Sequence, residues 1–319
     1  MKKYIKYIGP VILVFILYRA DWWEFYKALK DVAFISLIPV YLISLIKELS
    51  ASYRWHLLLK SVSIKRNFFA DLKLYMAGIM IGVVTPGRLG EIYKAFRLSK
   101  DKNTRIKGVF TIFLDRFLDL SFILIISILA VFFFIKPDIF KTFWPRAFLV
   151  TGVIVMFLFY VVLLNCKDFS GKLLKKIFKI EISSDRIEYY FKKFDINLLM
   201  RTGIITIIAW LINYYQIYLL GINLGIEISY VDMVFVQGIV SLAAALPVTI
   251  AGLGTREIVM INSLAVFSVS KENALALSFL IYTLMIFNLI ISSVFWILEH
   301  RRMNFNRVNN ENNMKNLSE

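Results

Sequence analysis

Residues 85–91 read Thr-Pro-Gly-Arg-Leu-Gly-Glu and interrupt an apolar run that begins at Phe68. A second interruption, residues 247–257, reads Pro-Val-Thr-Ile-Ala-Gly-Leu-Gly-Thr-Arg-Glu and follows the apolar run 233–246. Proline removes a helix hydrogen-bond donor, and glycine tolerates left-handed backbone. Each motif is therefore predicted to break a helix inside an apolar segment, and each places an arginine and a glutamate beside the break.

The chain around these motifs has the composition of a membrane protein. Of its 319 residues, 59% are hydrophobic and 16% aromatic, and the mean hydropathy is +0.69. A soluble domain of this length needs far more polar surface. A helix needs about 20 apolar residues to cross the hydrocarbon core, and an isolated strand cannot satisfy its hydrogen bonds there. The predicted spans are about 5–20, 33–59, 107–135, 147–165, 203–222 and 274–298.

Basic residues cluster between the apolar runs, so the net charge of +16 favours a membrane surface over nucleic acid as partner. Loops 60–66 and 88–107, which flank the first interrupted segment, are rich in Lys and Arg. Loops 222–232 and 269–273 flank the second interrupted segment, and Lys271 is the only Lys or Arg in them. The positive-inside rule places the first pair in the cytoplasm and the second outside. Each interrupted segment is thus predicted to be a re-entrant hairpin, with both chain termini cytoplasmic.

The predicted order of elements occurs twice. Residues 1–135 read span, span, hairpin, span, and residues 147–300 read the same from the opposite side. Inverted repeats with broken helices are a transporter architecture that binds substrate near the membrane midplane. We predict an all-α polytopic membrane protein with about six transmembrane helices and two re-entrant hairpins, forming one domain over residues 1–303. A basic cytoplasmic linker at 167–201 and a disordered cytoplasmic tail at 304–319 complete the prediction.

Ionisable side chains at membrane depth are costly and are therefore candidates for function. The helix after each break begins with unpaired N–H groups and a positive dipole end, which suits a phosphate or carboxylate. An adjacent arginine adds a bidentate partner for the anion. The candidate substrate-binding residues are Arg88, Glu91, Arg97, Thr255, Arg256 and Glu257. The candidate structural residues are Arg54, Pro86, Gly87, Gly90, Asp115, Arg116, Asp119, Pro247, Gly252 and Gly254.

Both groups of charged residues have a second interpretation. Glu91 and Glu257 either face a substrate or only cap their helices and pair with neighbouring arginines. Asp115 and Asp119 lie one helical turn apart, with Arg116 between them, near the cytoplasmic end of their span. This arrangement is more typical of a lock between helices than of a substrate site.

Metal and cofactor chemistry finds little support in the sequence. Cys166 is the single cysteine, and His56 and His300 are the only histidines, so neither residue type can supply a metal cluster. The chain has no Walker-type loop and no His-Glu-x-x-His motif. We expect no metal, no cofactor and no enzymatic activity.

The motifs together resemble the flippase-like membrane domain of lysylphosphatidylglycerol synthases, over roughly residues 5–300. The resemblance rests on residues 54–59 (Arg-Trp-His-Leu-Leu-Leu), 85–91 with Arg97-Leu98, 115–120 (Asp-Arg-Phe-Leu-Asp-Leu) and 247–257. In two-domain members it implies that this membrane part moves an aminoacylated phospholipid between leaflets, after a separate cytoplasmic domain has made it. Only a short tail follows the last predicted span, so lysyl transfer is not expected here. The matching motif residues are Arg88, Glu91, Arg97, Arg256 and Glu257.

These observations predict a flippase-like lipid transporter of the cytoplasmic membrane. Its expected partners are membrane lipids or lipid-linked intermediates with an anionic head group or phosphate, together with a lipid-modifying transferase; nucleic acid is not expected. Two alternatives stay open. One is a non-transporting scaffold for a glycosyl- or aminoacyltransferase, and the other is a membrane-embedded transferase acting on a lipid carrier.

Overall fold

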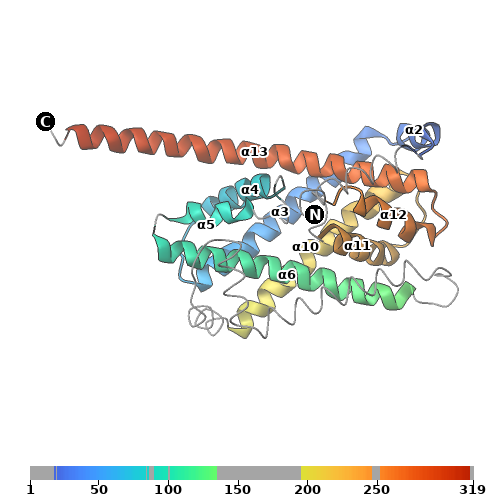
Figure 1. Ribbon diagram of the computed structural model, residues 1–319, viewed down its shortest axis with the longest axis horizontal. Coiled ribbons are helices and arrows are strands. Elements are labelled where there is room, and N and C mark those ends of the chain that lie inside the picture. Colours follow the sequence, from blue (N-terminus) through green and yellow to red (C-terminus); the bar gives the residue numbers. More distant parts are fainter. Residues whose placement is uncertain are drawn as a thin grey trace, which may run out of the picture.

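The computed structural model describes residues 18, 20–83, 85, 90–99, 101–134, 195–245 and 252–316. Within these ranges the regular elements are helices and no strand occurs, as the sequence predicts (Figure 1). Three of them are long and apolar enough to cross a membrane: α3 (Phe34–Ser61), α10 (Ile196–Asn223) and the first part of α13, Lys271–Glu299. They match the spans predicted at 33–59, 203–222 and 274–298. The span predicted at 147–165 lies outside the described residues, as do the span at 5–20, apart from residues 18 and 20, and the linker at 167–201, apart from residues 195–201.

α6 (Lys102–Phe134) is a further long helix, and α13 continues beyond its apolar part. α6 has 33 residues, enough to exceed the roughly 30 Å hydrocarbon core, and carries the charged triplet Asp115, Arg116 and Asp119. α13 runs on from Lys271 to Asn316 as one helix (Figure 1). It extends over residues 304–316, where the sequence predicts a disordered tail.

A short amphipathic helix, α2 (Trp22–Lys30), precedes α3. The Asp21 carboxylate caps it by accepting hydrogen bonds from the backbone N–H groups of Trp23 and Glu24, at 2.9 and 3.2 Å. Trp22 and Trp23 are exposed, and Phe25 packs edge-on against Phe279 of α13. Exposed tryptophans beside a membrane span are typical of an interfacial anchor.

The first broken segment is an antiparallel helical hairpin. α4 (Phe68–Val83) is followed by a 3₁₀ turn at 90–92 and then by α5 (Tyr93–Leu98). Glu91 lies against Gly82, and Lys94 lies against Gly78 one turn earlier on α4. Because the numbering rises along one helix as it falls along the other, the chain reverses direction at the break.

The second broken segment has the same form. α11 (Tyr230–Ala245) is followed by α12 (Thr255–Ala265), with Gly252 against Ala244 and the Gln237 amide nitrogen 3.5 Å from the Met260 sulfur. Gly252 and Gly254 have φ angles of 77° and 84°, which glycine adopts without steric cost. The predicted helix break is therefore confirmed, and these glycines make the turn.

The two halves of the chain share helix spacing and helix packing. α10, α11 and α12 begin at residues 196, 230 and 255, each 162 residues after α3, α4 and α5, which begin at 34, 68 and 93. α3 packs along α10, and each hairpin packs against the long helix of the other half, α4 on α13 and α11 on α6 (Figure 1). α5 contacts α6 just as α12 contacts α13. These contacts stay the same when each helix is exchanged for its counterpart.

α11 approaches α6 closely at Gly238. A Cβ atom there would lie 2.5 Å from Cγ2 of Ile126, and the Ser127 hydroxyl donates to the Gly238 carbonyl at 2.9 Å. The absence of a side chain at Gly238 therefore allows the second hairpin to reach the long helix of the first half.

We expect Gly238→Val to lower the melting temperature of the detergent-solubilised protein, because overpacking of this kind costs about 1–3 kcal/mol. Gly203→Val on α10 is the matched control, since a Cβ at Gly203 meets nothing within 4 Å. The control should melt like the wild type. Equal melting temperatures for both variants would contradict the close packing of α11 on α6.

Candidate functional site

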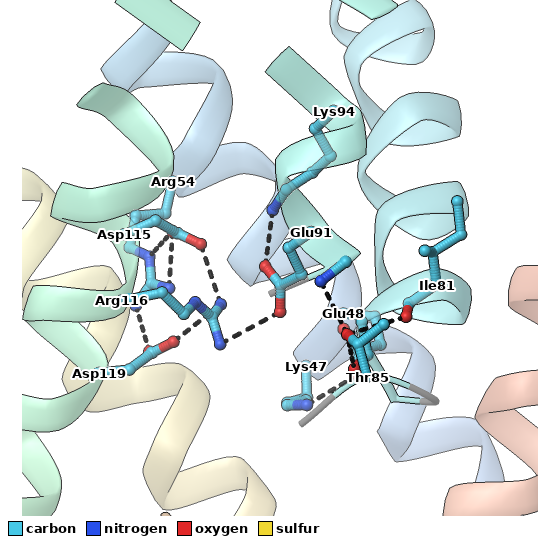
Figure 2. Close-up of polar contacts among 12 residues, drawn as sticks. Lys47, Glu48, Arg54, Ile81, Thr85, Glu91, Lys94, Asp115, Arg116 and Asp119 are labelled. Atoms are coloured by element: carbon cyan, nitrogen blue, oxygen red, sulfur yellow. Dashed lines mark hydrogen bonds and ion pairs between the residues drawn. The ribbon is translucent and has the colours of Figure 1, made fainter. Parts of the chain in front are cut away.

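A buried ionic network joins α3, α6 and α10 (Figure 2). Arg54 is 1% exposed, and its guanidinium lies 2.7 Å from Oδ1 of both Asp115 and Asp119. It also donates to the Thr206 hydroxyl at 2.8 Å, and the Trp210 indole donates to Asp119 at 2.9 Å. Asp115 and Asp119 can share Arg54 because they lie one turn apart on α6. The predicted lock between helices is present, with Thr206 and Trp210 as partners that the sequence did not reveal.

Arg116 connects this network to the first hairpin. Its NH2 nitrogen lies 3.0 Å from Oδ2 of Asp115 and 3.0 Å from Oδ2 of Asp119. Its NH1 nitrogen lies 3.4 Å from Oε1 of Glu91 at the hairpin turn. Unlike Arg54, the Arg116 side chain is 26% exposed. The charged triplet Asp115, Arg116 and Asp119 and the hairpin motif, which are far apart in the sequence, therefore form one site.

The other oxygen of Glu91 pairs with Lys94, which sequence analysis did not include among the candidates. Lys94 is fully buried, and its Nζ lies 2.9 Å from Oε2 of Glu91 (Figure 2). The ammonium also lies 4.4 Å from the ring centroid of Tyr75 and 5.1 Å from that of Trp55. The carboxylate and the two rings offset the desolvation of the buried cation. The spacing of three residues from Glu91 was the one sequence signal for this pair.

The turn of the first hairpin is held by Thr85. Its hydroxyl accepts a hydrogen bond from the Gly90 N–H at 2.7 Å and contacts the Gly82 carbonyl at 3.0 Å. A Cβ atom at Gly90 would collide with the carbonyl of Ile81, so the turn requires glycine there. The predicted site residues Pro86, Gly87 and Arg88 lie outside the described residues, as does Pro247 in the second motif.

In the second hairpin, Glu257 caps the returning helix. Its Oε2 accepts from the Gly254 N–H at 2.6 Å, and its Oε1 accepts from the hydroxyls of Ser278 and Tyr282, both at 2.7 Å. The guanidinium carbon of Arg256 lies 4.3 Å from the ring centroid of Tyr282. Glu257 thus has the capping role that was one of its two predicted interpretations, and α13 supplies partners that no sequence motif indicated.

The remaining candidates lie at the edges of these sites. The Thr255 hydroxyl donates to the Gly252 carbonyl at 3.1 Å and so supports the second turn. Arg97 stacks over Tyr93, with its guanidinium carbon 5.4 Å from the ring centroid, and its NH2 lies 3.9 Å from Oε1 of Glu299 on α13. Arg97 therefore links the first hairpin to α13.

The two hairpin sites have a common plan. Lys94 and Arg256 are each the second residue of the returning helix, and each is a buried cation over an aromatic ring. Each has a glutamate close in sequence, Glu91 or Glu257, that contacts the long helix of its own half. Groups of three or more side chains that could hold a metal ion do not occur among the described residues.

Comparison with known proteins places this geometry in a family. A family model described as the lysylphosphatidylglycerol synthase TM region matches residues 7–293, which include both hairpins and the ionic network. The chain belongs to this family. The resemblance predicted from the motifs is thereby confirmed over nearly the whole chain, and the chain is a multi-pass membrane protein of that family.

Relatives of the chain are named only as membrane proteins. It is 25% identical to UPF0104 membrane protein MJ1078 of Methanocaldococcus jannaschii, over 69% of this chain and 95% of the relative. It is 27% identical to UPF0104 membrane protein PH1989 of Pyrococcus horikoshii, over 87% of this chain and 90% of the relative. Neither name assigns a substrate or an activity to this family branch.

We expect Arg54→Gln to destabilise the protein by about 3–5 kcal/mol, because it leaves Asp115 and Asp119 buried without their main cation. The measurements are the melting temperature, which should fall, and the monodispersity of the protein in detergent, which should be lost. Lys27→Gln is the control: it breaks a pair with Glu24 whose side chains are half exposed, which is worth about 0–1 kcal/mol. An Arg54→Gln variant as stable as the control would refute the structural role of the network.

Proposed function

We propose that this protein moves a lipid with an anionic or phosphate-bearing head group between the leaflets of the cytoplasmic membrane. The observation that carries the proposal is the buried cation at the start of each returning helix, Lys94 in one hairpin and Arg256 in the other. Buried charge at membrane depth is costly, so it is kept where it serves a polar substrate. No enzymatic activity is proposed for the residues described.

The outer surface of the helices suits a substrate whose tails stay in the bilayer. Large apolar side chains are exposed along α3, α10 and α13, and include Ile38, Leu42, Ile46, Ile204, Ile207, Ile286 and Ile290. Such faces match lipid chains rather than water. Only the head group then needs a polar route, and the charged residues of the hairpins are the groups suited to provide it.

The two halves are proposed to be inverted repeats whose hairpins enter the membrane from opposite faces. The equal spacing of helix starts and the exchangeable helix contacts support this proposal. The basic loops beside the first hairpin favour entry from the cytoplasm, with both termini on that side. Because each hairpin packs on the long helix of the other half, movement of one would be felt by the other, as alternating access requires. A lipid-modifying transferase is the proposed supplier of the lipid.

We expect the purified protein, reconstituted in liposomes, to accelerate the exchange of fluorescent phosphatidylglycerol between leaflets, measured by dithionite quenching. Glu257→Gln should slow this exchange about tenfold or more, because hydrogen bonds to a charged group are worth about 1.5–3 kcal/mol. Glu227→Gln, an exposed carboxylate between α10 and α11, should exchange lipid like the wild type.

Rates equal to those of protein-free liposomes across a panel of anionic and zwitterionic lipids would contradict transport. A scaffold for a transferase would give that result. Both variants should first be shown to melt near the wild-type temperature, so that a slower rate reports on the hairpin and not on unfolding.

A further inference from the structure

Arg116 differs from Arg54 in how its guanidinium is used. Arg54 is enclosed by short contacts of 2.7–2.8 Å and is almost fully buried. Arg116 is 26% exposed and reaches Glu91 over a longer 3.4 Å. Its Nε is buried and makes no hydrogen bond within the described part of the chain. The hydrogen-bonding capacity of Arg116 is therefore not exhausted by its carboxylate partners.

Glu91 makes ionic contacts with Lys94 and with Arg116, and the two contacts differ in length. Its contact with Lys94, at 2.9 Å, lies within the hairpin and moves with it. Its contact with Arg116, at 3.4 Å, crosses from the hairpin to the fixed helix α6. Separation of the hairpin from α6 would therefore leave Glu91 paired with Lys94, while Arg116 would lose one anion. The Arg116 nitrogen that faced Glu91 would then be open to another anion.

We propose that Glu91 is an internal stand-in for the phosphate of a lipid head group. The phosphate replaces Glu91 on Arg116 and so removes the ion pair between α6 and the hairpin formed by α4 and α5. This inference rests on the proposed function and names the residue that binds the head group. Arg116, assigned a structural role from the sequence, becomes a substrate-binding residue, while Arg54 keeps Asp115 and Asp119 in place beneath it.

The chemistry of the exchange favours phosphate. Guanidinium groups bind phosphate oxygens through charge-assisted hydrogen bonds that are about twice as strong as neutral ones. Among its described contacts, Glu91 gives one oxygen to Lys94 and the other to Arg116, whereas a phosphate diester could direct both of its non-bridging oxygens to the Arg116 guanidinium. The cost of opening is limited, because no carboxylate is left buried without a cation.

The test measures lipid affinity of the full-length protein in a neutral maltoside detergent by isothermal titration calorimetry. The probes are dihexanoyl-phosphatidylglycerol, inorganic phosphate and dihexanoylglycerol, which separate a lipid phosphate from free phosphate and from the tails alone. The variants are Glu91→Gln, Arg116→Gln, Arg116→Lys and Glu299→Gln. Glu299 is the control because it faces Arg97 of the same hairpin at 3.9 Å and does not pair with Arg116 in any described contact.

We expect Glu91→Gln to bind dihexanoyl-phosphatidylglycerol about tenfold more tightly, because the competing internal anion is removed. Arg116→Gln should bind it at least about tenfold more weakly, with Arg116→Lys in between, since lysine keeps the charge and loses the bidentate geometry. Glu299→Gln should bind like the wild type. Inorganic phosphate should bind more weakly than the lipid, and dihexanoylglycerol should not bind.

An unchanged or weaker affinity of Glu91→Gln would overturn the inference, because a purely structural glutamate has no ligand to compete with. That comparison decides the matter even if Arg116→Gln fails to fold. Inorganic phosphate that binds as tightly as the lipid, with the same dependence on Glu91, would overturn the assignment to a lipid. If the lipid affinities change as expected but the protein does not accelerate leaflet exchange, only the transport proposal is refuted. If the protein accelerates leaflet exchange but Glu91→Gln does not bind the lipid more tightly, only this inference is refuted.

Discussion

The buried guanidinium of Arg54 joins three long helices, α3, α6 and α10. It is held by carboxylates of α6 and by a hydroxyl of α10, and so it fixes the crossing of three long helices at one point. A buried charge of this kind contributes little net stability compared with an apolar core, but removal of one partner is strongly destabilising. It therefore acts as a constraint on geometry, and it sets the position of the α6 face that the first hairpin contacts.

The hairpins pack against these long helices, and each adds polar contacts of its own. The first hairpin touches the network through Glu91 and Arg116, and the second is capped by Glu257 from within and held by Tyr282 of α13. Both hairpins are short helices around a glycine turn, while the helices beside them are long. We propose that a polar head group passes beside these short helices while the long helices keep their packing.

Much of this architecture could be predicted from local sequence, and the rest depended on contacts between distant residues. The helix breaks followed from proline and glycine, because their effect on backbone is local. The position of Asp115 and Asp119 on one face of α6 followed from helical spacing. The role of Lys94 could not be predicted from local sequence, because its environment includes Trp55 and Tyr75 from other helices.

We propose that two equivalent hairpins enter the membrane from opposite faces, and the sidedness of their flanking loops is the measurement that decides this. Single cysteines are placed at Asn103, beside the first hairpin, and at Glu227, beside the second, in a Cys166→Ser background. Intact cells are then labelled with a membrane-impermeant maleimide. The account predicts labelling at position 227 and protection at position 103 until the membrane is opened. Labelling of both positions from the same side would contradict it.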